Sequence, residues 1–300
     1  MSAALKKIVV VGVGLIGGSF ALALRKAGAV EQIVGVGRSA ATLQRAQQLG
    51  LIDRSAPIEE ALRDADLVLL SVPVAQTEAV LAAIKPHLSG KTVVTDAGSI
   101  KTEVVAAARR ALGERISQFV PGHPIAGREV SGPEAAIPDL YVGKKVVLTP
   151  LPENTEAQVE LVADAWRRCG AELHRLSAEQ HDAIFAAVSH LPHLLSFAFM
   201  DATLRKPNAD LLLEYAASGF RGFTRLASSS PEMWRDIAVA NRSAILSELD
   251  AYIAQLAHFR KQLADGDAAA MQAMFSHAQQ ARDAWLQQTD AAASPEEKNA

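Results

Sequence analysis

Lys-Ile-Val-Val-Val-Gly-Val-Gly-Leu-Ile-Gly-Gly-Ser-Phe, residues 7–20, is the segment from which the expected architecture of the chain follows. Its first half is a run of mostly β-branched apolar residues, short enough for a strand that is buried on both faces. Its second half places Gly12, Gly14 and Gly17 in the spacing G-x-G-x-x-G and leads into a helical pattern over 19–27. A strand, these glycines and a helix in that order predict a dinucleotide-binding site, and the alternative is a plain glycine-rich turn.

Each of the three glycines has a separate physical role in such a site. Gly12 permits the tight turn out of the strand, Gly14 lets the backbone approach a pyrophosphate, and Gly17 lets the helix lie close to the sheet. The N-terminus of that helix directs free N–H groups and a positive dipole end toward the phosphates. We therefore expect cofactor contacts from these glycines and from Leu15 and Ile16 between them.

The end of the second predicted strand, residues 32–37, favours NADP over NAD. An NAD site usually has Asp or Glu about 20 residues past the glycines, where the carboxylate binds the ribose 2′-hydroxyl. This chain has Gly37, then Arg38 and Ser39, so a guanidinium and a hydroxyl are available for a 2′-phosphate and no carboxylate repels it. The alternative is that Arg38 is a solvated loop charge, and NAD is the second candidate cofactor.

Strand and helix patterns alternate through the first 176 residues. We expect further strands over 65–72, 92–96, 144–149 and 171–176, and helices over 40–49, 58–62, 74–88, 101–112 and 155–169. This alternation predicts a Rossmann-type, doubly wound and mostly parallel sheet, with ligands at the carboxyl ends of its strands. Ser71, Val72 and Pro73 lie at one such end and are expected to contact the cofactor.

Two further polar residues follow predicted strand ends. Ser99 either caps the helix that follows it or contacts a ligand, and the two roles are compatible. His123 lies between Gly122 and Pro124 in a glycine- and proline-rich loop. A loop histidine is often structural, but this one lies at the carboxyl edge of a nucleotide-binding sheet and is therefore a candidate catalytic residue.

From Ser177 onward the pattern is almost entirely helical, with breaks near 206–208, 218–223, 228–231 and 265–267. We therefore expect a dinucleotide-binding domain over 1–176, an all-helical domain over 177–288 and a polar, disordered tail over 289–300. The apolar run over 183–200 is interrupted by Ser, His and Pro residues, so we expect a buried helix rather than a membrane span.

The helical domain contains two groups of candidate substrate-binding residues. His190 and His193 share one helix face if the helix continues through Pro192, and they either form a buried hydrogen-bonded pair or contact substrate. Arg221 and Arg225 lie in a glycine-containing loop and suit a carboxylate, because the guanidinium can bind it through two N–H groups. A surface ion pair is the alternative for Arg221.

The composition excludes several classes of protein. Three hundred residues that are 49% hydrophobic suffice for two domains, and a net charge of −3 gives no electrostatic reason to expect nucleic acid or a membrane as partner. The single cysteine, Cys169, cannot form an internal disulfide, and nothing near it has metal-ligand spacing. A metal at His190 and His193 would need further ligands, and no acidic partner stands at helical spacing from them. We expect a cytoplasmic protein without a metal.

Several segments together resemble those of prephenate and arogenate dehydrogenases of tyrosine biosynthesis. The shared segments are Val-Gly-Val-Gly-Leu-Ile-Gly-Gly-Ser (11–19), Asp-Ala-Gly-Ser-Ile-Lys (96–101), Gly-His-Pro-Ile-Ala-Gly (122–127), Ser-His-Leu-Pro-His (189–193), Gly-Phe-Arg-Gly-Phe-Thr-Arg (219–225) and Met-Trp-Arg-Asp-Ile (233–237). The second-domain motif at 189–193 together with that at 122–127 is far more specific than the glycine pattern alone.

The resemblance implies an NAD(P)-dependent oxidative decarboxylation of prephenate to 4-hydroxyphenylpyruvate, of arogenate to tyrosine, or of both. It implies that His123 accepts the proton of the ring hydroxyl and that Ser99 contacts both this histidine and the hydroxyl. It further implies that Arg225 binds a substrate carboxylate and that His193, with His190 second, lines the substrate pocket. Members of the family form homodimers through the helical domain, and we expect the same here.

The chain departs from the family pattern at two positions. Arg128 stands where well-known members carry a small hydroxyl residue, so it either binds the side-chain carboxylate of the substrate or turns to solvent. Gly37 stands where NAD-using members have Asp. We expect no chorismate mutase before the first strand and no regulatory domain after the helices. The competing hypotheses are a two-domain dehydrogenase of the β-hydroxyacid or imine reductase kind and a non-catalytic dinucleotide-sensing protein.

Overall fold

The structure, a computed structural model, describes residues 5–128 and 130–292. The chain divides into two compact units, one up to Ile245 and one from Leu246 onward. The first unit holds all the strands and the helices as far as the start of α12, and it contains every candidate site residue.

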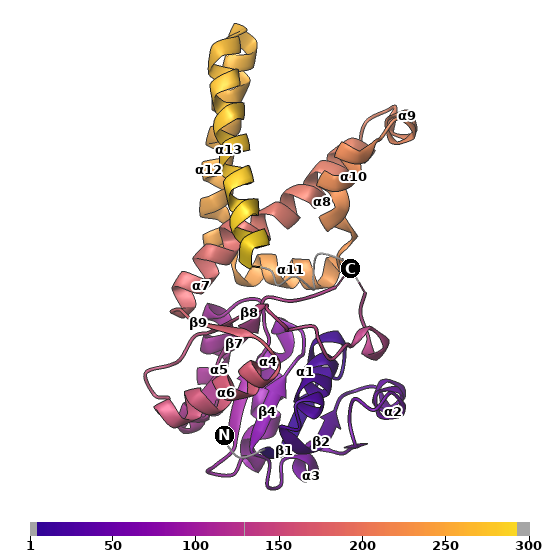
Figure 1. Ribbon diagram of the computed structural model, residues 1–300, viewed down its shortest axis with the longest axis vertical. Helices are drawn as coiled ribbons and strands as arrows, with labels where there is room; N and C mark the ends of the chain where they lie inside the picture. Colours follow the sequence, from indigo (N-terminus) through magenta and orange to yellow (C-terminus); the bar gives the residue numbers. More distant parts are fainter. Residues whose placement is uncertain (1–4, 129, 293–300) are drawn as a thin grey trace. The chain divides into compact units, whose positions relative to one another are not determined.

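The first unit is built on a six-stranded parallel sheet with the order β3-β2-β1-β4-β5-β6 (Figure 1). Its strands are β1 (Leu5–Val11), β2 (Val30–Val36), β3 (Arg54–Ser55), β4 (Leu67–Leu70), β5 (Val93–Asp96) and β6 (Phe119–Val120). The strand order reverses between β1 and β4, and this reversal creates the crevice in which such sheets bind ligands. The predicted Rossmann-type sheet is confirmed.

Helices cover both faces of this sheet because its central strands are apolar on both faces. The helices are α1 (Leu15–Lys26), α2 (Ala40–Gln48), α3 (Ile58–Ala61), α4 (Thr77–Ile84), α5 (Thr102–Leu112) and α6 (Glu156–Arg168). Val10 faces the core formed with α1 and α6, where the rings of Phe20 and Trp166 lie 4.5 Å apart. Val9 faces the core formed with α3, α4 and α5.

The helix predicted over 74–88 is divided into three pieces. A 3₁₀ turn (Val74–Gln76) precedes α4, and a second (Lys85–His87) follows it and contains Pro86. Further 3₁₀ turns are Gly113–Gln118 and Pro133–Ala135. The turn after β4 begins directly behind Pro73, so the strand end that faces the crevice is short and fixed in direction.

A second, three-stranded sheet carries His123. Its strands are β7 (Gly122–Pro124), β8 (Lys145–Leu148) and β9 (Glu172–Arg175), with β7 antiparallel and β9 parallel to β8. The prediction of a loop at His123 is therefore wrong. The segment forms a strand because its backbone pairs with β8, where His123 lies opposite Val147. The glycines and prolines around His123 indicate a turn locally and give no information about this distant partner strand.

The remaining helices of the first unit are α7 (Ala178–Phe185), α8 (Leu191–Leu204), α9 (Ala209–Glu214), α10 (Ser218–Thr224) and α11 (Pro231–Ala240). A single π-helical turn (Ala186–His190) joins α7 to α8 without a break. The helix continues through Pro192, which lies in the first turn of α8. Proline has no backbone N–H and cannot donate the usual α-helical hydrogen bond. The wider π turn directly before Pro192 changes the hydrogen-bond pattern there, so that this missing donor does not break the helix.

The loop predicted over 218–223 is instead the helix α10, followed by a 3₁₀ turn (Arg225–Ser228). Two glycines weaken this helix, but packing against α8 compensates for them. The ring of Phe199 lies 4.9 Å from that of Phe223, and Ser196 Oγ donates to the Phe223 carbonyl at 3.1 Å.

The segment Ala178–Leu204 is the one described helix that is long and apolar enough to cross a membrane by length and composition alone. We expected a buried helix here, and it is buried on one side only. Its buried side holds polar groups such as His181, Asp182 and His190, whereas Val188 and Phe199 are exposed. The buried side of this helix therefore carries several polar residues, and some of its large apolar residues face outward.

The second unit consists mainly of two long helices. α12 (Arg242–Asp265) begins in the first unit, and α13 (Ala268–Ala292) follows a turn at Gly266, whose φ is +68°. Within the unit, the rings of Phe259 and Phe275 are 6.0 Å apart. α13 extends four residues into the tail expected to be disordered, because helical periodicity continues through its alanines; residues 293–300 lie outside the described part of the chain.

Candidate active site

The turn between β1 and α1 has the geometry of a phosphate cradle. Gly12 has a φ of +94°, and a Cβ there would lie 2.3 Å from the Ser71 carbonyl oxygen. A Cβ on Gly17 would lie 2.4 Å from the Gly12 carbonyl oxygen, whereas one on Gly14 would meet no atom within 4 Å. Gly12 and Gly17 are therefore required by packing, and Gly14 borders open space at the N-terminus of α1, where a pyrophosphate fits.

A groove of about 540 Å³ adjoins this cradle at the end of β2. Gly37, Arg38 and Ser39 line it, and the last two are exposed. Ser39 is also the N-cap of α2, since its Oγ accepts the backbone N–H of Thr42 at 3.2 Å. The groove thus presents a guanidinium, hydroxyl groups and a helix N-terminus, which together suit an anion.

A cavity of about 380 Å³ continues from the cradle along the ends of β4 and β5. From the nucleotide-binding part it is lined by Ile16, Ser71, Val72, Pro73, Val74, Ala97, Gly98, Ser99 and Ser131. From the helical part α11 contributes Met233, Asp236 and Ile237, and the Asp236 side chain is only 13% exposed beside Arg235. The predicted residues Ile16, Ser71, Val72, Pro73 and Ser99 therefore share one cavity, which also adjoins α11.

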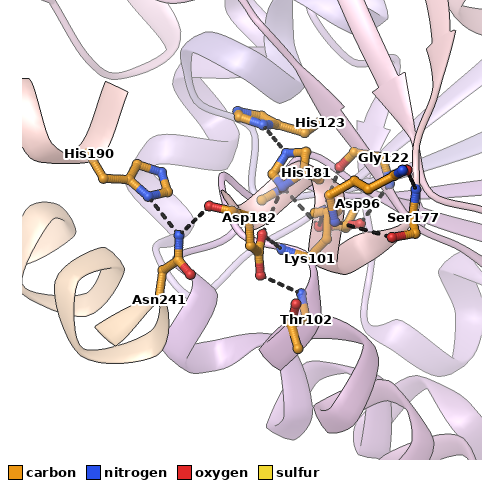
Figure 2. A network of polar contacts seen from close by, with 12 residues as sticks. Asp96, Lys101, Thr102, Gly122, His123, Ser177, His181, Asp182, His190 and Asn241 are labelled. Carbon is orange, nitrogen blue, oxygen red and sulfur yellow. Dashed lines mark hydrogen bonds and ion pairs between the residues drawn. The ribbon is translucent and has the colours of Figure 1, made fainter. Parts of the chain in front are cut away.

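His123 lies at the start of a chain of polar contacts that crosses from β7 to α7 (Figure 2). Its Nδ1 is 2.8 Å from Nε2 of His181, and its ring packs edge-on against Phe185 with centroids 5.0 Å apart. Among the residues that the structure describes, none is hydrogen-bonded to its other ring nitrogen, Nε2. The His123 ring is thus held on one edge.

Asp182 is the next member of the chain of contacts. Its Oδ1 accepts from Nδ1 of His181 at 2.8 Å and from the backbone N–H of Lys101 at 2.7 Å, and its Oδ2 accepts the N–H of Thr102 at 2.8 Å. Asp182 therefore caps the N-terminus of α5. Asp182 rather than Ser99 is therefore the cap, because α5 begins at Thr102 and the N–H groups of Lys101 and Thr102 are bonded to the Asp182 carboxylate.

A buried ion pair lies directly beneath this network. Lys101 Nζ is 2.5 Å from Asp96 Oδ2 and donates to the Gly122 carbonyl at 2.7 Å. The same Asp96 carboxylate accepts the backbone N–H groups of Gly98 and Gly122 at 2.8 and 3.0 Å. The pair thereby fixes the backbone of β7 on which His123 is carried.

The surroundings of His123 hold its imidazole neutral. Burial lowers the pKa of His123 well below 6.5, and His181, Lys101 and His190 lower it further because a second positive charge near them is unfavourable. Burial also lowers the pKa of His181, against the opposing effect of its hydrogen bond to Asp182. A neutral imidazole in such a position can accept a proton from a ligand.

The two histidines of the 189–193 motif are separately bonded. Asn241 Nδ2 donates to His190 Nδ1 at 3.0 Å and to the Asp182 carbonyl at 2.9 Å, and burial lowers the pKa of His190 to about 4. His193 Nδ1 donates to the Ser189 carbonyl at 2.8 Å, and its ring stacks on Trp234 at 3.7 Å. They form no pair with each other.

The three predicted substrate arginines lie in different places. Arg225 is exposed but close enough to His193 to lower the pKa of that histidine, after the larger effect of burial. Arg221 is exposed on α10. Arg128 is exposed and donates to the Ala135 carbonyl at 3.0 Å, so its guanidinium is directed along its own loop. Within the described residues, no group of three or more His, Cys, Asp or Glu side chains is placed to hold a metal ion.

Sequence reasoning did not identify four residues of this site: Lys101, His181, Asp182 and Asn241. The adjacent His181 and Asp182 follow the Ser177–Gln180 capping box, and both are buried. Polar residues are usually buried only when they are hydrogen-bonded to a partner. A His-Asp pair directly after the capping box, at the start of the apolar run that begins at Ala183, is the signal that indicates them. Lys101 and Asn241 offer no local signal of this kind.

Comparison with known proteins gives two adjoining family matches. Residues 20–175 match the prephenate dehydrogenase nucleotide-binding domain, and residues 177–277 match the prephenate dehydrogenase dimerization domain. Among curated proteins, cyclohexadienyl dehydrogenase of Zymomonas mobilis is 35% identical over 92% of this chain and 95% of its own length. Prephenate dehydrogenase of Bacillus subtilis is also 35% identical, over 92% of this chain and 75% of its own.

Solved structures show the same similarity. Prephenate dehydrogenase from A. aeolicus, in complex with hydroxyphenyl propionate and NAD⁺, has a TM-score of 0.85 and 33% identity, over 97% of this chain and all of its own. Synechocystis arogenate dehydrogenase has a TM-score of 0.80 and 29% identity, over 93% of this chain and 99% of its own.

Proposed function

The chain belongs to the prephenate dehydrogenase family, and from this membership we propose that it converts prephenate to 4-hydroxyphenylpyruvate, arogenate to tyrosine, or both, with His123 as the base. The protein is an oxidoreductase that uses a nicotinamide dinucleotide for oxidative decarboxylation. The observation that supports our assignment of the base is the burial of a neutral His123 whose Nδ1 is bonded to His181.

In the proposed reaction His123 takes the proton of the ring hydroxyl. The nicotinamide, when bound, accepts the hydride from the same ring carbon, which becomes a carbonyl carbon. The bond from the ring to its carboxylate then breaks, carbon dioxide leaves, and the electron pair of that bond moves through the ring onto the carbonyl oxygen, which makes the ring aromatic. That oxygen takes the proton back from His123 and becomes the hydroxyl of the product. The protein's contribution is orientation and charge placement, since aromatisation supplies the driving force.

Other residues orient the substrate in this proposal. Ser99 shares the cavity beside the phosphate cradle and would hydrogen-bond the reacting hydroxyl. Arg225 would bind a substrate carboxylate, with His193 beside it as a neutral hydrogen-bonding group. His190 is buried, is bonded to Asn241, which also donates to the Asp182 carbonyl, and lies close enough to the Ser99 backbone for it to raise the pKa of His190, so its role would be to support Ser99 and Asp182 rather than to contact substrate first. Arg128 and Arg221 stay candidates for a second carboxylate.

We further propose NADP as the preferred cofactor, with NAD as the alternative. Gly37, Arg38 and Ser39 line the groove that follows β2, and no carboxylate stands among them. Arg38 would bind the 2′-phosphate, and the N-terminus of α2 beside Ser39 would add favourable charge.

We propose that the protein is a cytoplasmic homodimer whose nucleotide-binding domain ends at residue 176. The helical residues 177–277 match a dimerization domain. Apolar side chains are exposed on α8 and, within the second unit, on α12 and α13, for example Phe199, Leu263 and Trp285. Exposed apolar residues at such positions are typical of subunit interfaces. Light scattering coupled to gel filtration would test this state, and a monomer at micromolar concentration would contradict it.

The decisive experiment is an assay of the purified protein with prephenate or arogenate, each with NAD or NADP, following the reduced nicotinamide. We expect turnover in at least one mixture, with NADP giving the higher kcat/KM. The absence of turnover in all four would overturn the proposed function. Product analysis by chromatography separates 4-hydroxyphenylpyruvate from tyrosine and so identifies the substrate actually used.

A further inference from the structure

We propose that His181 and Asp182 set the tautomer of His123, so that the unprotonated nitrogen is Nε2 and faces the substrate. This inference rests on the proposed function, in which His123 is the base. It assigns His181 as a positioning residue, because it acts through His123. Hydrogen-bond contacts connect Asp182 to His181 and His181 to His123 (Figure 2).

The first step fixes Asp182 as an acceptor. Its two oxygens accept the backbone N–H groups of Lys101 and Thr102, and it lies at the positive end of α5. These hydrogen bonds and that to His181 hold the pKa of Asp182 below its usual value, although burial opposes them. An ionised carboxylate has no proton to donate, so the proton of the 2.8 Å contact to His181 must be on His181 Nδ1.

His181 is fully buried. A neutral imidazole carries one ring proton, and here that proton is on Nδ1. His181 Nε2 is then a hydrogen-bond acceptor. It lies 2.8 Å from His123 Nδ1, so the shared proton belongs to His123 Nδ1.

The third step follows for His123 itself. With its single proton on Nδ1, its lone pair is on Nε2, the nitrogen for which the described residues provide no partner. Phe185 contacts both rings, at 5.0 Å from His123 and 4.5 Å from His181, and so limits their rotation. The base is therefore in its productive form before substrate arrives.

The same contacts act after the proton is taken up. The hydroxyl O–H bond breaks and an N–H bond forms at Nε2, which makes His123 a cation. Its Nδ1–H remains bonded to His181 Nε2, and no further proton moves. The cation then faces a hydrogen-bonded chain that ends in the Asp182 carboxylate, which stabilises it. Lys101 and His190 lower the pKa of His123 and so destabilise its cationic form. The hydrogen bond to His181 is therefore needed to offset their effect.

The direct test is nitrogen NMR of the protein labelled with ¹⁵N-histidine, near pH 7.5, with spectra recorded with and without NADP⁺. Two variants, His123→Asn and His181→Gln, assign the signals of the two rings. We expect His123 and His181 each to carry the proton on Nδ1 and none on Nε2. A proton on Nε2 of His123, or on both nitrogens of His181, would overturn the proposal. This readout is independent of turnover.

A matched pair of variants tests the consequence for catalysis. His181→Gln keeps an acceptor toward His123 and a donor toward Asp182, whereas His181→Leu removes both at similar volume. We expect His181→Leu to lose about 30-fold in kcat, with KM and the Kd for NADP within about threefold of wild type. His181→Gln should stay within about fivefold of wild type, and thermal unfolding should show that both variants fold.

Equal loss of kcat in the two variants would assign His181 a packing role only and overturn the positioning role. If wild type turns over no substrate in any of the four mixtures, the proposed function fails, and the NMR experiment still decides the tautomer. If wild type is active but His123 carries its proton on Nε2, only the present inference fails.

Discussion

Lys101 Nζ lies 2.5 Å from Asp96 Oδ2, with the lysine side chain 0% and the aspartate side chain 3% exposed. This pair connects the end of β5 to β7, because Lys101 also donates to the Gly122 carbonyl and Asp96 accepts the Gly122 N–H. A buried ion pair whose groups also make hydrogen bonds to the backbone is strongly destabilised when one of its partners is removed. It therefore gives the first prediction.

Lys101→Met is expected to reduce the free energy of unfolding by about 3–5 kcal/mol, because it leaves the Asp96 charge buried and unpaired. Urea unfolding monitored by circular dichroism measures the loss. The control is Lys261→Met, which breaks an exposed pair with Asp265 and should change stability little. Similar losses in both variants would show that burial of the pair is unimportant.

His123→Asn is expected to lower kcat about 10³-fold, because asparagine cannot take up a proton at this position. Cofactor binding should be unchanged, since the phosphate cradle and its groove lie on other segments of the chain. Turnover and quenching of protein fluorescence by the cofactor measure the two effects. His174→Asn is the matched control on the exposed surface of β9. Normal turnover in His123→Asn would remove this residue from the catalytic role.

Arg225→Ala is expected to raise KM for the substrate by about 10- to 100-fold, because a charge-assisted hydrogen bond to a carboxylate is lost. Steady-state kinetics at saturating cofactor measures the change. Arg205→Ala, which removes an exposed arginine paired with Asp201, should leave KM as it is. An unchanged KM in Arg225→Ala would argue against carboxylate binding by this arginine.

Arg38→Ala is expected to lower kcat/KM for NADP by at least about tenfold and to leave that for NAD nearly unchanged, because only NADP carries the 2′-phosphate. Kinetics with each cofactor at fixed substrate gives the comparison. The control Arg63→Ala alters another exposed arginine, in the turn between α3 and β4. If wild type has the higher kcat/KM with NAD, the argument from Gly37 and Arg38 is wrong.

Protein stability should fall as the pH is lowered from about 6.5 to about 4. The pKa of His190 is about 4 in the folded protein, below its ordinary value of 6.5, so only the unfolded state takes up a proton in this range. Stability from His190 is therefore present above pH 6.5 and decreases by up to about 3 kcal/mol toward pH 4. Unfolding by urea at a series of pH values measures the slope.

The charged and titratable groups that act on His190 are Asp182, which raises its pKa, and His181 and His193, which lower it. His190→Gln keeps an acceptor for Asn241 but cannot titrate, so its stability should depend less on pH. A slope remains in that variant, because burial also lowers the pKa values of His123, His181 and His193. An unchanged slope would mean that His190 is not buried as a neutral group.

The parallel sheet could be predicted because its signals are local. The four residues before Gly12, 8–11, are all apolar, and all four are buried in the strand that they form. The spacing of Gly12, Gly14 and Gly17 likewise reflects contacts within one turn and with the neighbouring strand end. The prediction was wrong for short segments whose structure depends on pairing with a distant strand. One example is β7, which is a strand because it pairs with β8.

The surroundings of His123 could not be predicted for the same reason. His181 is 58 residues away in sequence, and the contact between the two rings exists because α7, which packs against α5, brings His181 to β7. The motif around His123 identifies the base, but not the groups that hold it. Lys101 resembles a surface residue in sequence, and its burial follows from the position of Asp96 and Gly122.

The π turn Ala186–His190 makes one helix serve two different contacts. In a regular α-helix, His181 and His190 would point in opposite directions, since nine residues correspond to about two and a half turns. The π turn contains one extra residue, so the angle between the two side chains around the helix axis falls from about half a turn to about a quarter turn. His181 can therefore reach β7 while His190 reaches Asn241, and both histidines depend on the helix being one residue longer than regular winding requires.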